Sequence, residues 1–69
     1  MSRNFVILRD HKDGSQPEFF YRIGLGPFWE CGDQLENAFR FTSRDVAVTM
    51  LQQNGKHREG WRILRTDQV

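Results

Sequence analysis

The chain has 69 residues, 38% hydrophobic and 28% charged, and its ten basic and nine acidic residues leave a net charge of +1. These values are typical of one globular domain, residues 1–69, and not of a disordered or membrane-spanning chain. The near-neutral charge disfavours a protein that binds mainly phosphate backbones. The single cysteine leaves no internal disulfide, and the N-terminal segment has only four consecutive apolar residues. We therefore expect a cytoplasmic protein with no membrane partner.

The first part of the chain predicts a β-hairpin. Residues 4–9 (NFVILR) are apolar without alternation, which is typical of a strand covered on both faces. Turn-forming residues fill 10–17, and the aromatic-rich run 18–23 (EFFYRI) predicts the second strand. Its period of two divides the side chains between two faces, with Phe20 and Arg22 on one and Phe19, Tyr21 and Ile23 on the other.

A bend is predicted after the second strand. The glycines and proline of 24–27 (GLGP) weaken a strand ladder and indicate a corner or a bulge. They lack the third glycine and the following helix of a nucleotide-binding loop. Phe28 and Trp29 are expected to begin a short edge strand, and the polar stretch 31–37 (CGDQLEN) is expected to be a loop.

One helix is predicted between Thr42 and Gln53. Thr42 followed by Asp45 is a variant of the capping box, and Ser43 is a competing N-cap. The dipeptide 54–55 (NG) is typical of a helix end. The residues that fall on one apolar stripe of this helix are Val46, Ala47, Met50 and Leu51.

These elements predict an α+β domain in the order β-β-(β)-α-β, with an antiparallel sheet of three or four strands and one helix on one face. The last strand is expected at 60–65 (GWRILR), and residues 66–69 are expected to fray. The strands carry apolar residues on both sides, whereas one helix covers only one side. We therefore expect the second face to expose aromatic residues to a partner, and a homodimer is the simplest such complex.

The order of several residues resembles that of short phage, prophage and bacterial proteins in which a hairpin precedes a tryptophan and a helix. The residues that carry the resemblance are Tyr21, Trp29, the pattern Ala38-x-x-Phe41-x-Ser43, and Ala47. Some small phage proteins of similar build, such as anti-CRISPR proteins, bind a host enzyme or a defence complex. The resemblance implies a non-catalytic inhibitor that docks on a larger protein in the host cytoplasm.

Protein binding is the first function that the residues themselves support. Aromatic residues, tryptophan above all, are enriched at the centres of binding surfaces. Trp29, beside the bend, suits a surface anchor and the core equally, whereas Trp61 is expected in the core against Met50 or Leu51. The candidate protein-contact residues are Phe20, Tyr21, Phe28 and Trp29.

Nucleic-acid binding is the alternative. Basic residues that share a sheet face with aromatic residues form a stacking platform for single strands. In the competing interpretation, their stems pack on apolar neighbours and their charged heads lie in water, which the near-neutral charge favours. The candidate nucleic-acid residues are Arg22, Lys56, His57, Arg58 and Arg62.

No catalytic, metal or cofactor site is predicted. Nucleophilic catalysis needs a nucleophile and a base within hydrogen-bond reach, and the spacing of Cys31, His11 and His57 brings none of them together. Asp10, His11 and Asp13 are metal-ligand residue types, but their spacing fits a solvated turn better. We therefore expect a protein that is not an enzyme.

Overall fold

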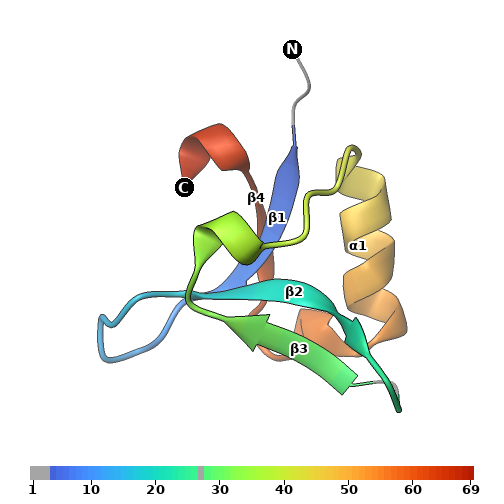
Figure 1. The fold of residues 1–69 in the computed structure, drawn as a ribbon, viewed down its shortest axis with the longest axis horizontal. Helices are drawn as coiled ribbons and strands as arrows, with labels where there is room; N and C mark the ends of the chain where they lie inside the picture. Colours follow the sequence, from blue (N-terminus) through green and yellow to red (C-terminus); the bar gives the residue numbers. More distant parts are fainter. Residues whose placement is uncertain (1–3, 27) are drawn as a thin grey trace.

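The computed structural model describes residues 4–26 and 28–69, which form a four-stranded antiparallel sheet and one α-helix (Figure 1). The predicted α+β class and element order are confirmed. The part of the predicted corner that falls on Pro27 lies outside the described residues. The strands are β1 (Phe5–Arg9), β2 (Glu18–Gly24), β3 (Phe28–Gly32) and β4 (Arg62–Arg65), and the helix is α1 (Arg44–Gln53). The 3₁₀ turns are η1 (Leu35–Asn37), η2 (Lys56–Arg58) and η3 (Thr66–Gln68).

The strands lie in the order β3-β2-β1-β4, and each neighbouring pair is antiparallel. β1 is therefore a central strand, as its unbroken apolar sequence predicts, and Val6, Ile7 and Leu8 are buried. The last strand begins at Arg62, two residues later than the predicted Gly60. The predicted loop after the bend begins too early, because Cys31 and Gly32 still belong to β3.

A β-bulge in β2 changes which side chains share a face. The register with β3 shifts between Phe20 and Arg22, so Tyr21 is an extra residue on the bulged strand. As a result Ile23 packs on the same core as Phe20, whereas Tyr21 belongs to the core of the opposite face. The predictions that Tyr21 shares a face with Ile23 and that Phe20 shares a face with Arg22 are therefore both wrong, because strict alternation ends at the bulge.

The helix begins where the sequence indicates. Of the two candidate N-caps, Ser43 is confirmed: its Oγ accepts a hydrogen bond from the backbone N–H of Asp45 at 3.2 Å, and Thr42 lies outside the helix. Asp45 in the first turn also faces the positive end of the helix dipole. The helix ends at Gln53, and Gly55 follows in a left-handed conformation, as predicted.

The helix covers one face of the sheet, which we call the helix face. Ala47 and Leu51 are buried there, and Met50 packs against them. Val46 is 54% exposed, so its predicted place in the apolar stripe is wrong. Val46 and Ala47 are neighbours in the chain and therefore lie about 100° apart around the helix axis. The buried residues of the helix-face core are Ile7, Phe20, Phe41, Ala47, Leu51 and Trp61.

The opposite face, which we call the outer face, is also covered. Leu35 of η1 and Ala38 pack there against Phe19, Tyr21 and the outward-facing residues of β1. The expectation that this face exposes its aromatic residues is therefore wrong for most of its area. Leu35 and Ala38 are isolated apolar residues in a polar stretch, where no periodicity marks them as core. The buried residues of the outer-face core are Val6, Leu8, Phe19 and Ala38.

The segment 39–41 carries the chain from the outer face to the helix face through an opening in the sheet (Figure 1). β1 and β2 pair only at Leu8↔Phe19 and Arg9↔Glu18. Beyond these two pairs, the segment forms backbone hydrogen bonds with each of the two strands in place of their bonds to each other. The Phe39 N–H donates to the Phe20 carbonyl at 2.9 Å, and Phe41 exchanges bonds of 2.7 and 2.8 Å with Phe5. The connection thus supplies hydrogen-bond partners to the backbone of Phe5 and to the carbonyl of Phe20 where the two strands diverge.

Candidate interaction surface

Among the residues that the structure describes, the most exposed large apolar side chains lie at the hairpin between β2 and β3. Leu25 is 95% exposed and Phe28 is 67% exposed. The strand pairing of Gly24 with Phe28 closes this hairpin, and Phe28 points to the outer face because its neighbour Trp29 packs on the helix face. η1 and Ala38 cover the outer face around Phe19 and Tyr21, whereas this end of the hairpin is left open.

The two glycines of the bend allow this arrangement. Gly26 has a φ of 101°, and a Cβ there would lie 2.7 Å from the ring of Phe28. Gly24 lies directly against the carboxylate of Glu30, so a side chain at position 24 would displace that carboxylate. The predicted bend is therefore confirmed, and both glycines make room for the side chains of β3.

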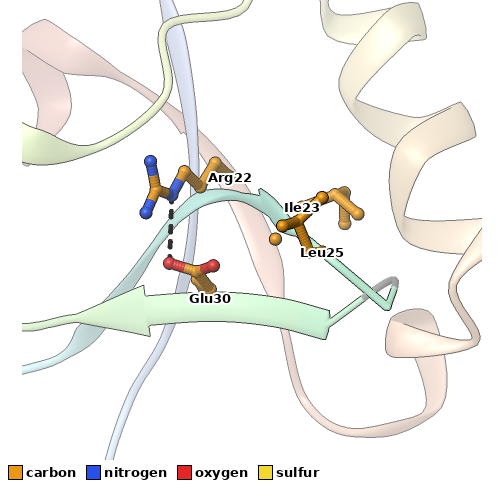
Figure 2. Close-up of a pocket in the computed structure, with 5 residues that line it drawn as sticks. Arg22, Ile23, Leu25 and Glu30 are labelled. Atoms are coloured by element: carbon orange, nitrogen blue, oxygen red, sulfur yellow. Dashed lines mark hydrogen bonds and ion pairs between the residues drawn. The ribbon is translucent and has the colours of Figure 1, made fainter.

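An ion pair lies beside the exposed apolar residues. The Arg22 Nε donates to Glu30 Oε1 at 3.0 Å, across the outer face from β2 to β3 (Figure 2). The pair borders an open hollow of about 490 Å³. The residues that line the hollow are Arg22, Ile23, Gly24, Leu25 and Glu30. We call Arg22, Leu25, Phe28 and Glu30 the hairpin-end patch.

The predicted contact residues are divided between core and surface. Phe20 is 1% exposed, so the expectation that it lies on an open sheet face is wrong. Tyr21 is half-buried, and its hydroxyl accepts a hydrogen bond from the Gln34 N–H at 2.8 Å, which fixes the chain entering η1. Phe28 is exposed, as a contact residue must be. Leu25 was not predicted, because one leucine between two glycines carries no periodic signal.

Trp29 packs mainly in the core. It is half-buried, its ring centroid lies 4.1 Å from that of Phe20, and it makes an edge-to-face contact with Trp61 at 5.3 Å. The Lys56 Nζ lies over the Trp29 ring, 5.5 Å from its centroid, within the range of a cation–π contact. Trp61 is buried in the same core as Leu51, as predicted. In the described part of the chain, neither indole N–H finds a hydrogen-bond acceptor.

The predicted nucleic-acid residues do not form one patch. Arg22 pairs with Glu30, and the Arg62 Nε donates to Asp10 at 2.9 Å. β1 lies between the strands that carry these two arginines. Lys56, His57 and Arg58 are together in η2, where Lys56 lies 3.4 Å from Glu59. Most of these cations therefore have a carboxylate partner, which lowers the positive potential that a phosphate backbone would meet.

A cluster of polar groups lies where the ends of β1 and β2 meet β3. Glu18 accepts from Arg9 at 2.8 Å and from the Cys31 thiol at 3.0 Å, and its Oε1 lies 3.3 Å from His11 Nε2. The structure thus joins Cys31 and His11 through Glu18, which their spacing in the sequence did not predict. Burial, and then the bond to Glu18, raise the pKa of Cys31 to about 11. The thiol is therefore protonated near neutral pH and is a poor nucleophile.

Three comparisons, with protein-family models, with curated proteins and with solved structures, find no significant match to this chain. Within residues 4–26 and 28–69, no group of three His, Cys, Asp or Glu side chains is placed to hold a metal ion. In the same part of the chain, no helix has the length and apolar character needed to cross a membrane.

Proposed function

We propose that this protein is a small protein-binding module that contacts its partner through the hairpin-end patch. The observation that carries the proposal is the exposure of Leu25 and Phe28 at the end of the same hairpin. A large apolar side chain in water contributes nothing to folding, but it contributes about 1.5–3 kcal/mol when a partner buries it. The adjacent Arg22–Glu30 pair supplies the polar rim that surrounds the centre of many interfaces.

The partner class follows from the resemblance to small phage proteins. We propose that the partner is a larger host or defence protein with an apolar cavity that takes Leu25 and Phe28. The module is then non-catalytic and acts by occupying a surface. Nucleic-acid binding is not proposed as a second function, because most of its candidate cations are paired with carboxylates on separate parts of the fold.

Replacing both exposed side chains tests the proposal. The immobilised chain is incubated with a bacterial lysate, and the retained proteins are quantified by mass spectrometry for the unchanged chain and for the double variant Leu25→Ser, Phe28→Ser. We expect proteins retained by the unchanged chain to be retained at least about tenfold less by the variant. Thermal denaturation should show that the variant is still folded, since both side chains are exposed.

The control is Val46→Ser, which removes an exposed apolar side chain from the helix. This variant should retain the same proteins as the unchanged chain. Equal retention by the hairpin double variant would contradict the proposal. Loss of the retained proteins after nuclease treatment of the lysate would instead support the nucleic-acid alternative.

A further inference from the structure

Both outer strands of the sheet have an unpaired side. Within residues 4–26 and 28–69, β3 pairs only with β2, and β4 pairs only with β1. The N–H and C=O groups on the outer side of an edge strand are a template for another strand. β3 (FWECG) contains no Lys or Pro, the residues that commonly block such edges.

The two edges carry complementary charges on the outer face. At one edge, Arg22 lies on β2 and Glu30 lies outermost on β3. At the other edge, Arg62 lies outermost on β4 and pairs with Asp10, which follows β1. The outermost charged side chain is therefore acidic at the β3 edge (Glu30) and basic at the β4 edge (Arg62). If the two edges met, the four side chains would alternate in sign, in the order Arg22, Glu30, Arg62 and Asp10.

The apolar residues of the two edges match in the same register. When β4 of one copy is placed antiparallel to β3 of another, with Arg62 opposite Glu30, Leu64 lies opposite Phe28 and Ile63 opposite Trp29. Leu64 belongs to the outer-face core and Ile63 to the helix-face core, so each pair joins side chains of the same face. The antiparallel direction also continues the alternation of the sheet.

From these observations we propose that a second copy of this chain binds at the sheet edge, with β4 of one copy adding to β3 of the next. The contact is head to tail, so each copy uses both edges. The Arg65 N–H already donates to the Gln68 side chain at 3.1 Å, so the added pairing is limited to Arg62–Leu64. An interface this short binds weakly, and the association depends on protein concentration.

The inference goes beyond the proposed function. Arg62 lies outside the hairpin-end patch, so a variant at this residue interrupts the edge contact and leaves Leu25 and Phe28 unchanged. Retention of a partner by an Arg62 variant that no longer self-associates would support both the proposed function and the edge contact, whereas retention of a partner by an unchanged chain that stays monomeric would support the proposed function alone. Self-association with no retained partner would support the edge contact alone.

Two charge-reversal variants and their mixture test the edge contact. The solution mass is measured by light scattering over a dilution series for the unchanged chain, for Glu30→Arg and for Arg62→Glu. We expect the unchanged chain to exceed the monomer mass as concentration rises, and each variant to lose at least about tenfold in association constant, because like charges then face each other. An equimolar mixture should associate again, since every junction between unlike copies pairs an acid with a base.

The matched control is the pair Glu36→Arg and Arg58→Glu, which makes the same charge changes at exposed positions of η1 and η2. These variants should associate as the unchanged chain does. A monomeric unchanged chain at all concentrations would overturn the inference. Association that persists in both edge variants, or a mixture that stays monomeric, would also overturn it.

Discussion

Glu18 holds together side chains from three parts of the sheet: Arg9 of β1, His11 of the following turn and Cys31 of β3. The hydrogen bond from Arg9, followed by that from Cys31, lowers the pKa of Glu18 from its ordinary value of 4.5. A carboxyl whose pKa is lower in the folded than in the unfolded chain stabilises the fold above its unfolded pKa. That stabilisation is lost as the pH falls through the folded pKa.

We therefore expect Glu18→Gln to lower the free energy of unfolding by about 1 kcal/mol near pH 7, because Gln cannot form the charge-assisted bond to Arg9. The difference from the unchanged chain should be smaller at a pH well below 4.5 than at pH 7, because the contribution of the ionised carboxylate is lost as the pH falls toward the lowered folded pKa of Glu18. Urea denaturation at both pH values measures it. Glu36→Gln, at an exposed position of η1, is the control. An equal loss at both pH values would mean that packing, and not charge, explains the effect.

At the scale of single elements, the start of α1 depends on Ser43. Its Oγ is the side-chain acceptor for an otherwise unpaired N–H of the first helical turn. Ser43→Ala should destabilise the protein by about 1 kcal/mol in chemical denaturation. Thr42→Ala, one residue earlier, should cost clearly less, since Thr42 lies outside the helix. A larger loss for Thr42→Ala would show that the helix begins one residue earlier in solution.

The elements with local signals could be predicted, and those set by distant partners could not. The helix follows from its cap and its apolar spacing, and β1 follows from an unbroken apolar run. The bulge at Tyr21 depends on how β2 meets β3, which leaves no mark in the sequence of β2 alone. η1 covers the outer face with Leu35, whose polar neighbours predict a loop. The bulge places Tyr21 and Ile23 against opposite cores, and η1 brings Leu35 from a predicted loop into contact with the outer-face core.

The candidate site was partly predictable for the same reason. The bend at Gly24 and Gly26 and the exposed Phe28 follow from glycine and aromatic residues close in sequence. The burial of Phe20 follows from the distant Phe41, and that of Trp29 from Trp61. Sequence spacing alone does not reveal such contacts.

At the scale of the whole molecule, the contact between Trp29 and Trp61 shows that the sheet curls around its helix face. Trp29 lies on β3, and Trp61 directly precedes β4, although these strands are at opposite ends of the sheet. Their edge-to-face packing joins the two ends of the sheet within the helix-face core.

Trp29→Ala should therefore destabilise the whole domain and not only remove a surface contact. We expect a loss of about 3 kcal/mol, because the variant leaves a cavity between Phe20 and Trp61. For a domain of this size the melting temperature should fall by at least about 10 °C. Leu25→Ala, at a fully exposed position, should change stability by less than about 0.5 kcal/mol. Equal melting temperatures for the two variants would show that Trp29 does not stabilise the core and lies at the surface instead.

The passage of the chain between β1 and β2 also bears on how the protein opens. Ala38 belongs to the outer-face core and Phe41 to the helix-face core, and the backbone between them is bonded to Phe5 and Phe20. Because this segment is shared, unfolding of either core would displace it and disrupt the packing of the other core. We therefore expect the two layers to unfold as one cooperative unit, so that hydrogen exchange of the backbone amides in β1 and in α1 should require the same global unfolding.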